Sequence, residues 1–366
     1  MLKGWLSILF LIMTIQAGKA QDRSIQDRAP LYVGAKVHYG TILPHYEELK
    51  EISQQKIWGF QLDFSKLFIS QKAWSNCNCY SRIGLSFNYF DYRNPQVLGH
   101  SYNILLFFEP YLNFNSRFRT SIRAGMGLNY LDQVFDEVIN PENLYYSSPI
   151  SGILVLNLNL NYLVQEKYQL NMGLHYNHIS NGGLKLPNKG MNFPTLSAGL
   201  DYIIHPTTLV SQKKQPGLKS KSLHYYTRLF WSIRTVSADE NYDENKKLMI
   251  GLEGGVIKGI TNINGILLGM EISYDGSYRE MSNRVMENYS PFIVSLHAGH
   301  AFVIGRFSFT QQMAYYAFRD YPSTSKSFFQ RYGIFYNFGK LISLGFSMKA
   351  HGHVAEHMDV RIGVEF

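Results

Sequence analysis

The sequence predicts an all-β protein, an antiparallel β-barrel that crosses an outer membrane. Apolar and polar residues alternate with a period of two along many segments, as in strands with one lipid-facing and one polar face. The 366 residues include 26 Tyr and 24 Phe, and only 17% are charged, below the roughly 25% of soluble domains. After residue 20, no apolar run approaches the ~18 residues of a membrane helix, so membrane embedding requires a barrel. A secreted all-β protein would share the alternation but needs fewer outward aromatic residues.

Residues 1–20 form a predicted secretory signal peptide. Lys3 precedes an apolar segment that runs from Trp5 to Ile15, and Gly18–Ala20 supplies a small-x-small cleavage site. An exported barrel is expected in the outer membrane of a Gram-negative cell. The chain ends on Phe366 after an alternating segment, which resembles the assembly signal of many outer-membrane barrels. The barrel assembly machinery is therefore an expected partner.

Alternation predicts about sixteen strands in two sets of eight. The first set falls within residues 21–206 and the second within residues 223–366. The expected strands are 31–43, 56–70, 79–92, 99–114, 118–133, 151–164, 168–180 and 193–204, then 224–236, 247–259, 264–275, 291–304, 306–318, 328–338, 341–351 and 354–366.

Short and long connections alternate along the chain. Connections such as 165–167 and 305–306 are short, whereas 136–150, 181–192 and 274–290 are longer and polar. Outer-membrane barrels combine short periplasmic turns with long outer loops. This pattern predicts that segment 181–192 faces the outside of the cell.

One connection breaks this rule, because the linker 207–222 is long and basic where a short turn is expected. The linker either lies within one sixteen-stranded barrel or joins an eight-stranded barrel to a second β-domain. Expected inward positions of the first half are small or amide residues, while those of the second half include Glu253, Glu271 and Arg361, which suggests a wetter lumen. We favour one barrel, since two complete barrels in one chain would be unusual.

The most informative stretch follows the strand 168–180. With a period of two, His178 and Ser180 project together from the apolar face at the end of this strand. An imidazole and a hydroxyl at this spacing can hydrogen-bond and so activate a serine. Asn181, Gly182 and Gly183 follow at once and could stabilise an oxyanion through an amide and backbone N–H groups. A polar strand end entering a loop would have the same composition.

The wider segment, His178-Ile-Ser180-Asn181-Gly-Gly-Leu-Lys-Leu-Pro187-Asn188-Lys-Gly190, resembles the outer-membrane lipid A 3-O-deacylases of the PagL type, also described as bacterial acyloxyacyl hydrolases. The resemblance covers about residues 30–206. It implies an eight-stranded barrel whose triad faces the lipid and cleaves an ester-linked acyl chain. Ser180 would be the nucleophile, His178 the base, and Asn181 would lie near the oxyanion. Where the family carries its glutamate, this chain has Asn192.

Other candidate chemistry is weaker. Cys77 and Cys79 are the only two cysteines, and their spacing favours incidental loop thiols. His351, His353 and His357 could offer metal ligands, but polar residues at a barrel mouth are the preferred interpretation. No metal or other cofactor is expected. The net charge of +8 suits a phosphate-rich lipid, and no motif suggests nucleic acid.

The sequence therefore predicts a carboxylic ester hydrolase that removes an acyl chain from lipid A of lipopolysaccharide in the outer leaflet. Ser180, His178 and Asn192 would be catalytic, with Asn181, Gly182 and Gly183 at the oxyanion. Alternatives are a catalytically silent barrel with a structural or lipopolysaccharide-binding role, and a channel. The acyl chain that is cleaved and the oligomeric state remain open.

Overall fold

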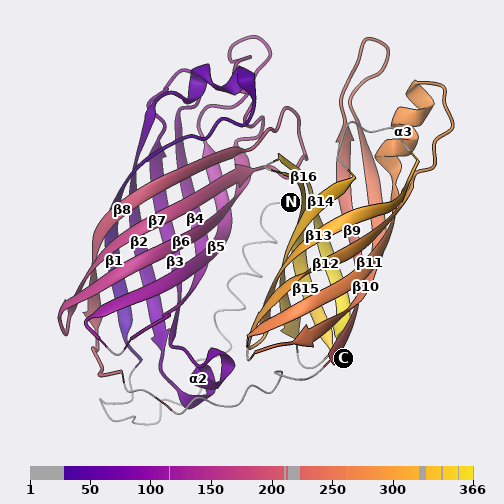
Figure 1. The fold of residues 1–366 in the computed structure, drawn as a ribbon. Coiled ribbons are helices and arrows are strands. Elements are labelled where there is room, and N and C mark those ends of the chain that lie inside the picture. The colour runs from indigo at the N-terminus through magenta and orange to yellow at the C-terminus, as the bar shows by residue number, and fades with distance from the viewer. Residues whose placement is uncertain are drawn as a thin grey trace, which may run out of the picture.

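The protein, a computed structural model, folds into two closed antiparallel β-barrels (Figure 1). The structure describes residues 29–114, 116–209, 212, 223–261, 263–320, 327–338, 341–352 and 354–365. The expected signal peptide, Phe366 and most of the linker 207–222 lie outside these residues.

The first barrel contains β1 to β8 and the second contains β9 to β16. The strands of the first are β1 Leu31–Thr41, β2 Lys56–Phe68, β3 Ser81–Asp91, β4 His100–Pro110, β5 Phe118–Leu131, β6 Ile150–Gln165, β7 Tyr168–Ser180 and β8 Met191–Ile204. Those of the second are β9 Leu223–Val236, β10 Asn245–Gly259, β11 Asn264–Asp275, β12 Phe292–Ile304, β13 Phe307–Arg319, β14 Phe328–Phe338, β15 Ile342–His351 and β16 Val354–Glu365.

The all-β class and the division into eight plus eight strands are confirmed. The preference for a single sixteen-stranded barrel is wrong. In the first barrel β1 pairs with β8, with Leu31 opposite Ile204, and in the second β16 pairs with β9, with Val360 opposite Trp231. In each set the first and last strands pair with each other, so neither barrel has an unpaired edge strand that could pair with the other barrel.

Each barrel is apolar outside and polar inside, as β7 shows. Its outward residues Leu170, Met172 and Leu174 are 49%, 66% and 53% exposed. Its inward residues, such as Gln169 and His175, are buried. This arrangement reverses that of a soluble protein and is typical of a barrel whose outer surface contacts lipid. Separately, none of the helices in the described ranges has the length and hydropathy to cross a membrane.

Ion pairs fill the lumen of the first barrel. Arg82 contacts Glu109 at 2.9 Å and Asp201 at 2.8 Å. Arg123 contacts Asp63 at 2.7 Å, and all five side chains are buried. Because each buried charge has a partner of opposite sign, the network satisfies groups that would otherwise be costly to bury.

The second lumen is also crossed by ion pairs between buried side chains, and its expected wetness stays a prediction. Arg361 contacts Glu271 at 2.9 Å and Asp359 at 2.6 Å. Arg331 also contacts Glu271 and Asp359, each at 2.7 Å. Glu253 is completely buried and pairs with Arg361 as well. Charged side chains meet across this lumen instead of lining an open channel.

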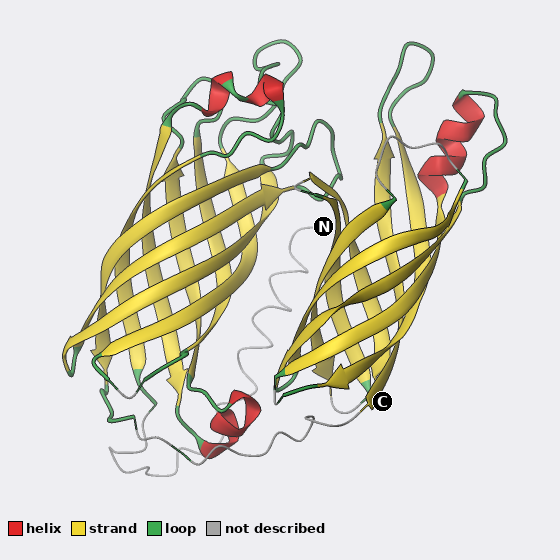
Figure 2. Cartoon of the chain, viewed as in Figure 1, coloured by secondary structure: helices red, strands yellow, loops and turns green. Residues whose placement is uncertain are grey.

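Most of the longer connections of the two barrels gather at one end, here named the long-loop end (Figure 2), whereas the connection 69–80 lies at the other. The first barrel carries two short 3-10 helices there, η2 Glu47–Leu49 and η3 Glu51–Ser53, and the second carries α3 Gly276–Arg284. The opposite, short-turn end holds α2 Gln71–Cys77. Cys77, the last residue of this helix, forms a disulfide with Cys79, so the expectation of free thiols is wrong.

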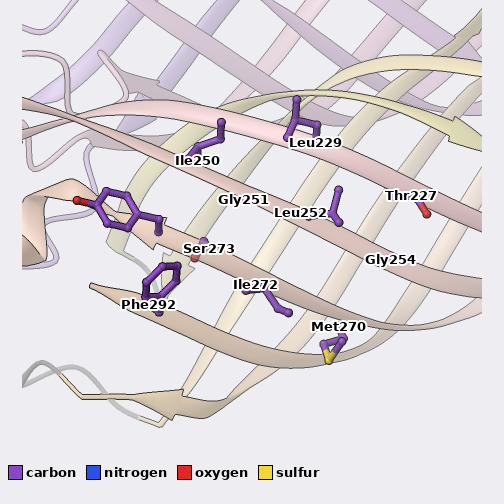
Figure 3. A pocket seen from close by; sticks show the side chains of 11 residues that line it. Thr227, Leu229, Ile250, Gly251, Leu252, Gly254, Met270, Ile272, Ser273 and Phe292 are labelled. Carbon is purple, nitrogen blue, oxygen red and sulfur yellow. The ribbon is translucent and has the colours of Figure 1, made fainter. Parts of the chain in front are cut away.

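A shallow groove of about 540 Å³ lies on the outer face of the second barrel (Figure 3). Small residues such as Gly254 and Thr227 leave a depression there between larger apolar side chains, among them Leu252 and Met270. Its lining comes from β9 to β12 and includes none of the predicted site residues. The groove is therefore a feature of the lipid-facing surface that is separate from the candidate active site.

Candidate active site

The pairing of β7 with β8 brings His178 and Asn192 together. They are directly opposite each other in the antiparallel register, which places the two side chains on the same face. His178 Nδ1 lies 2.7 Å from Asn192 Oδ1. An amide oxygen only accepts, so Nδ1 carries the proton and Nε2 keeps the free lone pair. This is the tautomer that a general base needs.

Ser180 lies two residues after His178 on the same outward face, at the end of β7. Its Oγ accepts hydrogen bonds from Asn188 Nδ2 at 2.9 Å and from the Gly182 backbone N–H at 3.0 Å. His178 Nε2 has no hydrogen-bond partner among the described residues. The expected bond between this imidazole and the Ser180 hydroxyl is therefore not formed in this conformation.

The three residues expected at the oxyanion differ in where their donors point. The Gly182 N–H points at Ser180 Oγ, whereas the Gly183 N–H donates to Asn181 Oδ1 at 2.9 Å. The Asn181 amide nitrogen donates to the Lys185 carbonyl at 2.8 Å. Gly182 and Gly183 have φ angles of +70° and +81°, which favour glycine. Of these three residues, only Gly182 directs a donor at the hydroxyl.

Asn188 is the residue that sequence reasoning missed. Its Nδ2 contacts Ser180 Oγ, and its Oδ1 accepts from the Asn181 backbone N–H at 3.1 Å. One side chain thus links the hydroxyl to the start of the loop. The sequence contained a signal, because Asn188 belongs to the Pro-Asn-x-Gly part of the recognised motif, but its spacing from Ser180 does not indicate contact.

The neighbouring loop 132–149 holds the segment that carries Asn188. The N–H groups of Lys189 and Gly190 donate to the carbonyls of Leu144 and Tyr145 at 3.1 and 2.9 Å. Burial raises the pKa of Tyr145 to about 12, so its hydroxyl stays protonated and can donate to Ser53 Oγ at 2.6 Å. Loops distant in sequence therefore determine where Asn188 lies.

No nearby acid replaces the missing glutamate on this face of β8. Asp201 points into the lumen, where it pairs with Arg82 at 2.8 Å. Asn192 remains the residue that contacts the imidazole. An amide can orient the ring but supplies no negative charge to stabilise an imidazolium.

The histidines near the end of the chain belong to a different cluster. His351 Nε2 lies 2.9 Å from Glu356, and Lys349 and Arg234 contact the same carboxylate at 3.1 and 2.6 Å. His353 lies outside the described residues. Over the ranges that the structure covers, no group of three or more His, Cys, Asp or Glu residues could hold a metal ion.

Two family models match successive parts of the chain. Residues 57–201 match the family described as lipid A 3-O-deacylase (PagL), and residues 223–366 match the family described as acyloxyacyl hydrolase, C-terminal domain. The second match lies outside residues 30–206, to which the resemblance in the sequence is confined. No curated protein matches the chain.

Solved structures of membrane barrels resemble parts of the chain. The Neisserial surface protein A (NspA) is 16% identical, and the match covers 47% of this chain and 96% of that protein, with a TM-score of 0.33. The outer membrane enzyme PagL is 18% identical, with 46% and 97% covered and a TM-score of 0.34. At TM-scores this low, these structures add nothing to the assignment, which comes from the family models. Residues 57–201 belong to the lipid A 3-O-deacylase (PagL) family, and residues 223–366 belong to the acyloxyacyl hydrolase C-terminal domain family.

Proposed function

We propose that this protein is an outer-membrane serine esterase that removes an ester-linked acyl chain from lipid A. The observation that carries the proposal is the position of His178, Ser180 and Asn192 on the outward face of the first barrel, at its long-loop end. A lipid anchored in the outer leaflet could present its ester to this face without leaving the membrane. Membership of residues 57–201 in the deacylase family supports the substrate class.

The reaction begins with a rotation of the Ser180 side chain towards His178. The proton of Oγ passes to His178 Nε2, and Oγ bonds to the acyl carbonyl carbon. This rotation leaves the Gly182 N–H and Asn188 Nδ2 directed at the space that Oγ has vacated. The carbonyl oxygen can occupy this space, where two preorganised donors would stabilise its negative charge.

The second half of the reaction regenerates the enzyme. The carbon–oxygen bond to lipid A breaks, and the departing hydroxyl takes the proton from His178 Nε2. Water then gives a proton to Nε2 and attacks the acyl-serine, which releases the fatty acid and returns the proton to Ser180 Oγ. Asn192 holds the ring through Nδ1 in both halves.

A catalytically silent, lipopolysaccharide-binding barrel is the second candidate. Two observations favour it, namely the amide in place of the family's glutamate and the absence of a bond between Ser180 and His178 Nε2. The channel alternative gains no support from lumens crossed by ion pairs.

The deciding experiment uses the full-length protein in detergent micelles with lipid A as substrate. Fatty-acid release is followed by mass spectrometry and compared with Ser180→Ala and His178→Ala variants that still show the heat-modifiable gel mobility of closed barrels. We expect release by the wild type and none by either variant. Absence of release from lipid A and from a p-nitrophenyl acyl ester would leave the silent barrel as the function.

A further inference from the structure

Ser180 is unusually well covered for a residue on the outward face of a barrel. Leu174 and Tyr176 precede it on the same face of β7 and are 53% and 45% exposed, whereas Ser180 is only 6% exposed. Its own loop accounts for part of this cover through Gly182 and Asn188. The other side of that loop is in contact with the second barrel.

Three residues of the second barrel make this contact, and together they are named the rim contact: Thr235 of β9 with Glu356 and Met358 of β16. Thr235 Oγ1 donates to the Leu184 carbonyl at 3.4 Å. A Cβ added to Gly182 would lie 3.6 Å from the Met358 Cβ. One added to Gly183 would lie 3.6 Å from the Glu356 carbonyl. The turn that follows Ser180 therefore packs against the second barrel, and Figure 1 shows β16 beside the loops of the first.

The rim contact is itself held firmly within the second barrel. The Glu356 carboxylate accepts from Arg234 at 2.6 Å and pairs with Lys349 at 3.1 Å. Ser232 Oγ donates to the Met358 carbonyl at 2.6 Å. Charged and hydrogen-bonded groups on β9, β15 and β16 thus fix the backbone that faces Gly182 and Gly183. A surface held in this way can restrict the conformation of a glycine-rich turn that would otherwise be mobile.

We propose that the second barrel is a positioning element for the ester site. The rim contact holds the Gly182–Leu184 turn so that the Gly182 N–H remains aimed at the reacting position. This inference rests on the proposed esterase function and assigns the second barrel a part in it. Met358 and Thr235 act through the turn and do not touch the reacting atoms.

The test compares Met358→Ala with two matched variants of the full-length protein. Met358→Leu keeps a side chain of similar volume at this position. Ile362→Ala truncates a side chain of similar size on the same strand and the same outward face, where Ile362 is 43% exposed. For each variant, kcat and KM are measured on a p-nitrophenyl acyl ester, and heat-modifiable mobility confirms closure of the barrels.

We expect Met358→Ala to lower kcat about 10-fold with KM nearly unchanged, because small misplacements of catalytic groups cost up to about 10²-fold. Met358→Leu and Ile362→Ala should retain wild-type kcat. If the barrels of the Met358→Ala variant do not close, Thr235→Val is used instead. It removes the hydrogen bond to Leu184 with little change of shape. It should lower kcat about 3-fold, because the turn is displaced less.

If Met358→Ala or Thr235→Val forms closed barrels and has the wild-type kcat, the positioning role is overturned and the esterase proposal stays intact. An equal loss of kcat in Ile362→Ala would also overturn it, since the effect would then be general. An inactive wild type would overturn both proposals, so the two failures are distinguishable.

Discussion

At the scale of single residues, the proposed chemistry depends on what Asn192 can and cannot do. Its Oδ1 fixes the tautomer of His178 through a 2.7 Å contact, which is one of the two tasks of a triad acid. The other task, stabilisation of the imidazolium formed during attack, requires a negative charge. In the proposed mechanism, the His178 base therefore receives less electrostatic support than a carboxylate would provide.

Asn192→Glu should raise kcat, because it supplies that charge at the position where the family carries glutamate. Exchange of a triad aspartate for asparagine costs about 10⁴-fold where the tautomer also becomes wrong. Since the tautomer is already correct here, we expect a smaller gain of about 10-fold. The measurement is fatty-acid release from lipid A, with Asn192→Ala as a control that should fall below wild type. If the Asn192→Glu variant is inactive while the wild type is active, the Asn192 amide is the group that supports catalysis in this site.

Asn188→Asp tests the role of Asn188 as an oxyanion donor in the proposed mechanism. The substitution keeps an acceptor for the Asn181 N–H but replaces the donor that points at Ser180 Oγ. Loss of one oxyanion donor typically costs about 10²–10³-fold in kcat, and we expect a loss of this size. Asn181→Asp is the comparison variant and should lose less kcat, because the Asn181 amide points at Lys185 O and not at the Ser180 hydroxyl. Equal losses in the two variants would contradict the assignment of Asn188.

At the scale of elements, the site is a strand–loop–strand unit. The register of β7 against β8 fixes His178 and Asn192, since residues directly opposite in an antiparallel pair must share a face. The loop between these strands is less constrained locally and is held by contacts with the loop 132–149. Gly190 lies where loop and strand meet, with a φ of +69°.

Gly190→Ala should impair catalysis through His178. The added Cβ would lie 3.1 Å from His178 Cε1, so the ring must move. Gly352→Ala is the matched control, because Gly352 has a φ of +68° but nothing within 4 Å of the added Cβ. Both variants should lose about 1–2 kcal/mol of stability from the left-handed conformation. Only Gly190→Ala should lose kcat as well, and equal activities would contradict the steric argument.

At the scale of the whole molecule, two barrels present their long loops at the same end (Figure 2). Each lumen is crossed by buried ion pairs centred on an arginine, Arg123 in the first barrel and Arg361 in the second. Because removal of one partner from a buried pair is costly, these networks favour a packed interior over an open pore. Candidate functional sites are therefore expected on the outward faces and in the long loops, not in the lumens.

This arrangement predicts a common orientation for the two barrels in the membrane. Lys185→Cys and Asp243→Cys, one in a long loop of each barrel, should react with an impermeant maleimide on intact cells. Glu166→Cys and Thr261→Cys, at exposed positions of the short turns, should react only after permeabilisation. The native cysteines form a disulfide, so the background should be low. Labelling of Lys185→Cys only in permeabilised cells would invert the topology and place the ester site in the wrong leaflet.

The sequence by itself determined the strands and the face of β7 from which His178 and Ser180 project. Alternation is a local property, and a period of two leaves each side chain only one of two faces. The recognised motif also identified the nucleophile, the base and the position of Asn192 as candidates. Their catalytic roles remain predictions.

Only the tertiary structure decided which edge strands pair, and hence that two barrels form instead of one. The same alternation fits both closures, because closure depends on contacts between strands far apart in sequence, such as β9 and β16. For the same reason the sequence could not place Asn188 beside Ser180, or Met358 beside Gly182. Local pattern determines which way a side chain points, whereas the packing of distant segments determines what it meets.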